Sequence, residues 1–284
     1  SFPTRRASDL QRDMAVAGFR TIRDSGQLIS QAATGIGKTM AVLYPTLKAL
    51  GQGSTRKVIF LTARTTGRLA AQTALAELAD AGMRLKWMCL TAKDKICFSP
   101  DSACSPDECP YAKGFFDRLN PAILAALDHD ALERDTIEHL ARDFQVCPFE
   151  FSLELVDWSD CIIADYNYAF DPTVRLKRLF EEGGRHDTLL VDEAHNLVDR
   201  SRQMFSADLN KQAVLELRGA LKQEQPRMYK ALGRVNAWLA ALRKRCQEAG
   251  GTQVDADPPE GLVDRVRAFL KMADRWLRLN EPRA

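Results

Sequence analysis

Residues 32–39 read Ala32-Ala33-Thr34-Gly35-Ile36-Gly37-Lys38-Thr39. They match the phosphate-binding pattern G-x-x-x-x-G-K-[ST], except that Ala32 stands in place of the first glycine. A strand-like run precedes them at residues 27–31, and an apolar run at helical density follows at residues 40–44. In a strand, loop and helix arranged in this order, backbone N–H groups and the helix N-terminus converge on phosphate oxygens. The pattern therefore predicts a nucleotide site in an α/β fold.

An acidic pair follows another apolar run, in the stretch Leu189-Leu190-Val191-Asp192-Glu193-Ala194-His195. The carboxyl ends of parallel strands are where α/β sheets bind nucleotides. We expect Lys38 to contact the β and γ phosphates and Glu193 to orient or deprotonate the attacking water. Thr39 and Asp192 are the expected Mg²⁺ ligands. His195 is a further catalytic candidate, although a lone histidine is more often structural.

The rest of the chain divides into regions of different pattern. Strand-like runs occur at residues 57–62, 160–164 and 188–192, with a helix-like run at 69–78. Strands that alternate with helices predict an α/β domain with a parallel sheet. The strand pattern stops between residues 89 and 147, where we expect a helical insertion. Beyond residue 204, apolar stripes at helical spacing predict helices over 228–242 and 262–277.

Composition excludes several classes of protein. The chain has 284 residues, and its 45% apolar content excludes disorder for most of its length. No run approaches the length of a membrane span and no signal peptide is visible, so we expect a cytoplasmic protein without membrane contact. The net charge of +2 says little about partners. Residues 205–284 carry 15 Lys and Arg against 10 Asp and Glu, a difference of +5.

The chain contains seven cysteines, and an odd number without an export signal argues against a disulfide framework. Four of them lie within 51 residues: Cys97, Cys104, Cys109 and Cys147. Four thiolates can hold either Zn²⁺ or a [4Fe-4S] cluster, and the spacing alone does not separate the two. The other three cysteines are expected to be packed or surface thiols: Cys89, Cys161 and Cys246.

These motifs resemble those of the superfamily two DNA helicases, and within them the XPD/DinG group. The resemblance rests on the loop at 32–39, the Asp-Glu-Ala-His (DEAH) box followed by Asn196, and Asp165-Tyr166-Asn167-Tyr168 with Asp171-Pro172 downstream. It identifies the chain as a bacterial-type N-terminal motor half. It implies a RecA-like P-loop NTPase domain over 1–88 and 148–203, an iron-sulfur domain over 89–147, and an incomplete, helical Arch-like segment over 204–284.

The resemblance also assigns individual residues. It implies that Gln11 recognises adenine. The alternative is that Gln11 is an ordinary glutamine on a helix surface. It implies that Arg64 and Thr65, in the segment 62–66, contact the DNA backbone. It favours the [4Fe-4S] cluster over Zn²⁺ because this family inserts such a cluster between the two nucleotide motifs. Basic residues near the cysteines offer phosphate contacts, among them Arg118.

The implied function is an ATP-dependent DNA helicase of DNA repair that uses ATP and Mg²⁺ to translocate 5'–3' on single-stranded DNA and to unwind duplex junctions. The alternative is a metal-containing nucleic-acid-binding module with an ATP-controlled switch and no unwinding, and a third reading is a cluster-based redox sensor. Only 89 residues follow His195 (284 minus 195), and they read as helices. We therefore expect a second RecA-like domain C-terminal to this chain and no unwinding by the chain alone. Separately, we expect a monomer.

Overall fold

The computed structural model describes residues 9–32, 37–180, 186–257 and 259–280. The chain forms two compact units, residues 1–205 and 206–284. The first unit contains α1 (Asp9–Arg23), α2 (Lys38–Gly51), β1 (Lys57–Leu61), α3 (Thr65–Asp80), β2 (Trp87–Cys89), α4 (Lys93–Ile96), α5 (Phe115–Leu127), β3 (Ala131–Leu132), α6 (Arg134–Asp143), α7 (Pro148–Leu155), the 3₁₀ helix η1 (Val156–Trp158), β4 (Cys161–Ala164), α8 (Asn167–Phe170), α9 (Lys177–Phe180), β5 (Asp187–Val191), the 3₁₀ helix η2 (Ala194–Asn196) and α10 (Leu197–Met204). The second contains α11 (Lys211–Ala220), α12 (Pro226–Glu248) and α13 (Leu262–Asn280).

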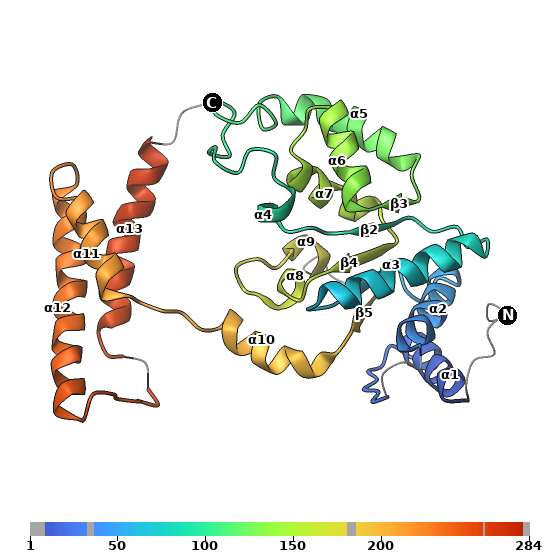
Figure 1. Ribbon diagram of the computed structural model, residues 1–284, viewed down its shortest axis with the longest axis horizontal. Helices are drawn as coiled ribbons and strands as arrows, with labels where there is room; N and C mark the ends of the chain where they lie inside the picture. The colour runs from blue at the N-terminus through green and yellow to red at the C-terminus, as the bar shows by residue number, and fades with distance from the viewer. Residues whose placement is uncertain (1–8, 33–36, 181–185, 258, 281–284) are drawn as a thin grey trace. The chain divides into compact units, whose positions relative to one another are not determined.

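A sheet lies at the centre of the first unit (Figure 1). It has five strands in the order β3-β2-β4-β1-β5. Every pair of neighbouring strands is parallel. In register, Leu61 at the end of β1 lies opposite Ala164 of β4 and Val191 of β5. The three strands therefore end at the same side of the sheet, the side of their carboxyl ends. The acidic pair begins there, directly after β5.

Helices cover both faces of this sheet, so the first unit has three layers. Val58 and Phe60 of β1 face one layer and pack with residues of α2 and α3. Ile59 and Leu61 face the other layer and pack with residues of α5, α6 and α7. All five residues of β1 are buried, as expected for a parallel strand with helices on either side. The predicted α/β fold with a parallel sheet is confirmed.

The strand expected at residues 27–31 is absent, and that prediction is wrong. These residues have no regular secondary structure, and Ile29 is 97% exposed. Within the described residues, β5 pairs with β1 alone and forms an edge of the sheet. The run holds only Leu28 and Ile29 between polar residues, and β-propensity forms a strand only where neighbouring strands and burial support it.

The segment between residues 89 and 147 contains the helices α4, α5 and α6, as expected, but residues 97–114 form no helix, and the segment also adds a strand. β3 has two residues and pairs with β2, which makes it the opposite edge of the sheet. Two residues are too few for an alternating pattern to be visible in the sequence. The helices of this segment share the core of the sheet, since Ile123 of α5 and Ile137 of α6 lie in the same apolar cluster as Ile59.

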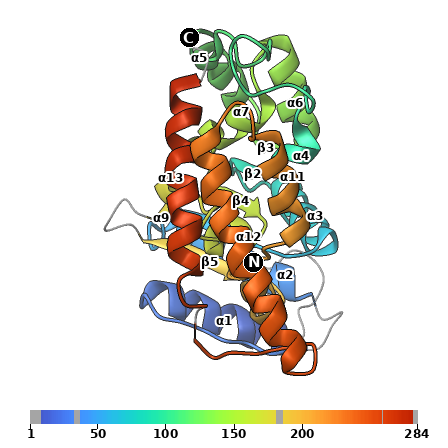
Figure 2. The same ribbon diagram turned by 90° about the vertical axis from the view of Figure 1, so that its left-hand side faces the viewer.

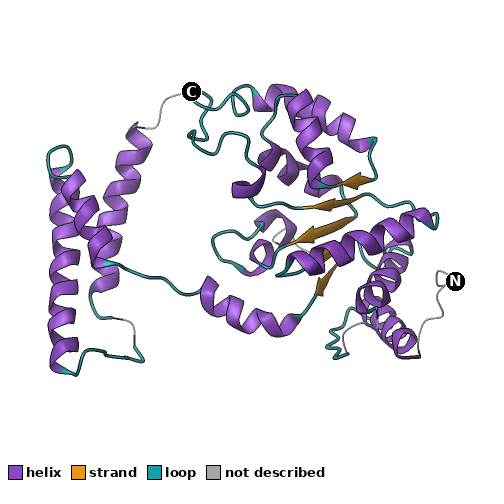
Figure 3. Cartoon of the chain, viewed as in Figure 1, coloured by secondary structure: helices purple, strands orange, loops and turns teal. Residues whose placement is uncertain are grey.

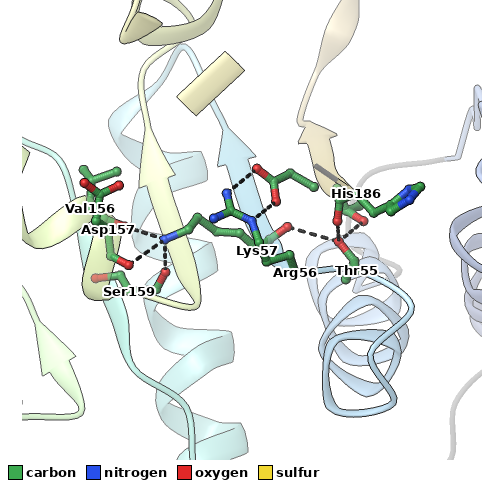
Figure 4. Close-up of polar contacts among 9 residues, drawn as sticks. Thr55, Arg56, Lys57, Val156, Asp157, Ser159 and His186 are labelled. Carbon is green, nitrogen blue, oxygen red and sulfur yellow. Dashed lines mark hydrogen bonds and ion pairs between the residues drawn. The ribbon is translucent and has the colours of Figure 1, made fainter. Parts of the chain in front are cut away.

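A polar network ties together the amino ends of the strands (Figure 4). The ammonium of Lys57 donates to the carbonyl oxygens of Val156 and Ser159, each at 2.6 Å. Arg56 binds both carboxylate oxygens of Asp187, at 3.0 and 2.9 Å. Burial, and secondarily the charge of Arg56, lower the pKa of Lys57. These bonds join β1 to β5 and to the segment before β4, at the end of the sheet away from the acidic pair.

The second unit is a helical assembly of α11, α12 and α13, which run side by side (Figure 2). Its small core is formed by Val214, Leu232 and Val235, with Val266 and Phe269 packed against it. The helices predicted over 228–242 and 262–277 are confirmed as α12 and α13. Among the described residues, strands occur only in the first unit (Figure 3). None of the described helices is long and apolar enough to cross a bilayer.

Candidate nucleotide and metal sites

Lys38 and Glu193 meet at the carboxyl edge of the sheet although 155 residues separate them. The Lys38 Nζ lies 3.2 Å from Glu193 Oε1 and 3.3 Å from the carbonyl oxygen of Ala32. Their side chains are 28% and 36% exposed, so the pair is accessible to a ligand. Lys38 is the first residue of α2, and Glu193 comes two residues after the end of β5. The fold thus joins the two predicted motifs into one site.

Asp192 precedes Glu193 and is half-buried in the same site. Its Oδ2 accepts a hydrogen bond from Thr62 Oγ1 at 3.4 Å, and its backbone N–H donates to the Leu61 carbonyl at 2.9 Å. Burial, and next the charge of Glu193, raise the pKa of Asp192, while Lys38 opposes the rise. A cation bound at this carboxylate would relieve the repulsion between the two acids, so the site is chemically suited to a divalent ion.

Glu193 adopts a left-handed backbone conformation with φ 51° and ψ 47°. This conformation is uncommon outside glycine, asparagine and aspartate, and it turns the chain sharply from β5 into η2. Asn196 holds the turn, because its backbone N–H and its side-chain Nδ2 both donate to the Glu193 carbonyl, at 2.9 and 3.0 Å. His195 is 70% exposed, and its Nδ1 lies 3.4 Å from Glu193 Oε2 at the rim of the site.

Gln11 of α1 lies against the end of the phosphate-binding motif. A Cβ placed on Gly37 would lie 2.5 Å from Gln11 Nε2, and Gly37 itself has φ 77°. The fold therefore brings the predicted adenine-recognising glutamine to the loop. Thr39 is in the first turn of α2 and borders an open pocket of about 460 Å³ between α2 and α3. The remaining loop residues named by the motif, Ala33 to Ile36, lie outside the described residues.

The segment 62–66 leads from β1 into α3, whose first residue is Thr65. Arg64 and Thr65 are both exposed. The Arg64 backbone N–H donates to Thr62 Oγ1 at 3.4 Å, and Thr62 in turn bonds Asp192. Thr62 therefore links the backbone of the predicted DNA-contacting segment to the Asp192 carboxylate of the candidate metal site through two hydrogen bonds.

Gly67 is a site residue that the sequence analysis missed. A Cβ at this position would lie 2.2 Å from Thr62 Oγ1 and 2.6 Å from Asp192 Oδ2. The first turn of α3 therefore approaches the acidic carboxylate so closely that no side chain fits between them. A glycine in the first turn of a helix is a weak signal, because only the fold shows what lies opposite.

We expect Gly67→Ala to lower the affinity for Mg²⁺ and ATP by about 10-fold, since it displaces Thr62 or Asp192 from their present positions. Isothermal titration of Mg²⁺ with ATP measures the change. Gly219→Ala is the matched control, because Gly219 also lies in a helix and a Cβ there meets nothing within 4 Å. Equal affinities for Gly67→Ala and the parent chain would contradict the close approach.

The cysteines at 97, 104 and 147 lie around Lys93, at the start of α4. Lys93 bonds Cys104, and this contact raises the pKa of Lys93. The Cys97 sulfur accepts from the Ser99 N–H at 3.4 Å, and the Cys147 sulfur accepts from the backbone N–H groups of Phe149 and Glu150. Burial raises the pKa of Cys147 despite these donors.

These surroundings suit thiolate ligands in chemistry, because backbone N–H donors and a nearby cation stabilise sulfur in its charged form. Cys109 is buried, and no interaction among the described residues joins it to the other three. Across the described ranges, no group of three or more His, Cys, Asp or Glu side chains has the geometry of a metal site. The four cysteines and the hydrogen bonds to their sulfurs therefore fit a metal centre in chemistry. The four sulfurs do not lie close enough together, in this structure, to form a metal site.

The remaining cysteines include two in the core. Cys89 of β2 and Cys161 of β4 are 2% and 0% exposed. Burial raises their pKa values to about 11 and about 12, which keeps both thiols protonated and unreactive at neutral pH. Their predicted role as packed thiols is confirmed, and Cys246 is half-buried on α12.

Arg118 has a structural role in this region. Its Nη2 donates to the Gln145 carbonyl at 2.7 Å and to the Pro110 carbonyl at 3.5 Å, and it also donates to the carbonyl of Lys113. The side chain thus ties the segment after Cys109 to the segment before Cys147. The phosphate contact considered for Arg118 competes with these carbonyl bonds.

Comparisons with known proteins agree with this geometry. The DEAD_2 family model matches residues 79–214, a stretch that includes the cysteine segment and the DEAH box. The fold resembles an XPD helicase structure, with a TM-score of 0.58 and 15% identity over 96% of this chain and 47% of that one. It also resembles a truncated XPD, with a TM-score of 0.56 and 15% identity over 95% of this chain and 76% of that one.

Over residues 79–214 the chain resembles the DEAD_2 family, and its fold resembles that of the XPD helicase structures. Two curated proteins share sequence with this chain. The Fanconi anemia group J protein homolog of Gallus gallus is 28% identical over 78 residues, or 28% of this chain and 6% of that protein. The ATP-dependent DNA helicase CHL1 of Candida glabrata is 24% identical over 147 residues, or 45% of this chain and 18% of that protein. This chain thus matches less than a fifth of either relative's length.

Proposed function

We propose that this chain is the ATP-binding half of a DNA helicase that couples ATP hydrolysis to 5'–3' translocation on single-stranded DNA and to unwinding at duplex junctions. The observation that carries the proposal is the contact of Lys38 with Glu193 beside Asp192, at the carboxyl edge of a parallel sheet. A cation, a half-buried acid and an accessible acid at the carboxyl ends of the strands are the groups that bind and hydrolyse a nucleoside triphosphate.

In the proposed reaction, Lys38 exchanges its present partner for the β and γ phosphates of ATP. The exchange releases the Glu193 carboxylate, which then orients or deprotonates the attacking water. The same ammonium therefore has two partners in turn, and Glu193 becomes available only when phosphate is bound. Asp192 and Thr39 would hold Mg²⁺, and Gln11 beside Gly37 would contact adenine. His195 contacts Glu193 from the rim of the site.

The proposed path of the DNA runs past Arg64 and Thr65. Both residues are exposed at the start of α3, where a guanidinium and a hydroxyl can bind phosphate without reading base sequence. Their backbone leads through Thr62 to Asp192, so a shift of this turn on DNA binding would reach the carboxylate that holds Mg²⁺. The connection through Thr62 supports the proposal that binding of DNA increases the rate of ATP hydrolysis.

The proposed metal centre is a [4Fe-4S] cluster held by Cys97, Cys104, Cys109 and Cys147. The N–H bonds to the sulfurs of Cys97 and Cys147 support thiolate ligands, and Zn²⁺ is the alternative metal. A bound cluster would supply covalent links between segments that are far apart in sequence. Two basic residues orient these segments. Lys93 bonds Cys104, and Arg118 donates to the carbonyl oxygens of Lys113 and Gln145.

A direct test of the function measures ATP hydrolysis with and without single-stranded DNA, together with displacement of a labelled strand from a 5'-tailed duplex. Assays on these 284 residues are compared with a longer chain that carries a second RecA-like domain. We expect DNA-dependent hydrolysis and unwinding from the longer chain. ATP-dependent DNA binding without any strand displacement by the longer chain would instead favour a switchable nucleic-acid-binding module.

The ligand assignment predicts that Cys104→Ser or Cys109→Ser removes most of the iron, because an incomplete thiolate set cannot retain a four-iron centre. Anaerobic purification, visible absorption and quantified iron and zinc measure the outcome. Cys246→Ser is the control, since Cys246 lies on α12 in the second unit and should leave the metal content unchanged. Full iron retention in both ligand variants would remove these cysteines from the site, and zinc without iron in the parent protein would identify the other metal.

A further inference from the structure

The hydroxyl of Tyr166 reaches from the end of β4 to the acidic pair, where it donates a hydrogen bond to the backbone carbonyl of Asp192. Tyr166 is fully buried. Burial, followed by the charges of Asp192 and Glu193, raises the pKa of Tyr166 to about 12, so the hydroxyl keeps its proton at neutral pH. A buried hydroxyl is a stronger and better oriented donor than one in water.

A second set of contacts fixes the segment that carries Tyr166. The Arg200 Nη2 on α10 lies 3.3 Å from Asp165 Oδ1 and 3.1 Å from Asn167 Oδ1. Asp165 Oδ1 also accepts from the Asn167 backbone N–H at 2.9 Å. Arg200 therefore binds the residues on both sides of Tyr166. Its Nε is buried without a hydrogen-bond partner among the described residues, and its Nη1 donates to Gln203 Oε1 at 3.4 Å.

The carbonyl that Tyr166 binds belongs to the peptide between the two site carboxylates. Rotation of this peptide would move the Asp192 and Glu193 side chains relative to each other. On the far side of the turn, Asn196 binds the Glu193 carbonyl at 2.9 and 3.0 Å. The left-handed conformation of Glu193 is thus held by one donor before it and by another after it.

We propose that Tyr166, held by Arg200, is a positioning residue that sets the orientation of the Asp192–Glu193 peptide and thereby places the metal-binding and water-orienting carboxylates. The inference rests on the proposed function for its effect on hydrolysis. The geometric part concerns the turn itself and is testable without nucleotide. The Tyr166 hydroxyl binds the Asp192 backbone carbonyl and neither carboxylate, so its loss should change the rate of hydrolysis and leave the binding of ATP unaltered.

Tyr166→Phe removes the hydroxyl and keeps the ring in the core. Tyr168→Phe is the matched control, because Tyr168 is buried in the same segment, burial also raises its pKa to about 12, and its hydroxyl makes no hydrogen bond to a described residue. We expect Tyr166→Phe to lower kcat by about 10-fold, the lower end for a residue that supports a site ligand. The KM for ATP should stay within about twofold, since the lost bond is not to the nucleotide.

Hydrogen–deuterium exchange of the segment 192–197 provides a readout independent of catalysis. The Asn196 amide, which bonds the Glu193 carbonyl, should exchange faster in Tyr166→Phe and at the parent rate in Tyr168→Phe. Arg200→Ala should show the same faster exchange, and Arg200→Lys should recover part of the protection because it restores the charge beside Asp165. Thermal melting identifies any variant that has lost the fold.

Unchanged exchange and unchanged kcat in Tyr166→Phe would overturn the inference, as would equal losses in Tyr166→Phe and Tyr168→Phe. A rise in KM without a fall in kcat would also overturn it, because it would place Tyr166 in nucleotide binding. If the parent protein bound no ATP, the proposed function would fail. Faster exchange confined to Tyr166→Phe and Arg200→Ala would then still show that these residues hold the turn.

Discussion

Glu193→Gln is expected to lower the rate of ATP hydrolysis by about 100-fold or more, the usual contribution of a general acid or base, while ATP remains bound. The amide keeps the size of the side chain but cannot take a proton from water. It also removes the charge that holds Lys38 at 3.2 Å in this structure. Lys38 then meets phosphate without first leaving a carboxylate, so the affinity for ATP should equal or exceed that of the parent.

Measurements of this effect need single-turnover hydrolysis with radiolabelled ATP and a separate titration of ATP binding. Asp199→Asn is the matched control, because Asp199 is an exposed acid on α10 whose carboxylate pairs with Arg202 rather than with Lys38. It should hydrolyse at the parent rate. Normal hydrolysis by Glu193→Gln would show that another group prepares the water, and His195 would be the nearest candidate.

Lys38→Ala is expected to weaken ATP binding by about 10-fold to 100-fold, since a hydrogen bond to a charged group contributes about 1.5–3 kcal/mol. The substitution has a second consequence for the acidic pair. Lys38 opposes the rise in the pKa of Asp192, so its loss should raise that pKa further. Protonated Asp192 is a poor Mg²⁺ ligand, and the deficit in Mg²⁺ binding should therefore be largest at low pH and shrink as the pH rises.

Titrations of ATP at several pH values and Mg²⁺ concentrations test both consequences. Lys48→Ala is the control, because Lys48 lies in the last turn of the same helix, α2, and is exposed there. Its loss should leave ATP and Mg²⁺ binding as in the parent. A Lys38→Ala chain that binds ATP at parent affinity would exclude Lys38 from phosphate binding, whatever its distance from Glu193.

Patterns confined to a few neighbouring residues predicted β1, β4, α12 and α13 correctly. β1 and β4 are buried along their whole length and read as apolar runs, whereas α12 and α13 each pack one face against a common core and read as apolar stripes. Residues 27–31 had the same type of pattern and formed no strand, since two apolar residues do not create burial by themselves. β3 has only two residues, which is too short for a visible sequence pattern. It forms a strand because it pairs with β2.

By itself, the sequence determined the chemistry available to this protein: a cation in a phosphate-binding motif, an acidic pair after a strand, and four clustered cysteines. Residue type and local spacing carry that information. Only the tertiary structure decided that Lys38 pairs with Glu193, that Gly67 leaves room for Asp192, and that Tyr166 holds the peptide between the acids. Those contacts join β1, β4 and β5, whose order in the sheet follows from packing on both faces and not from the sequence of any one strand.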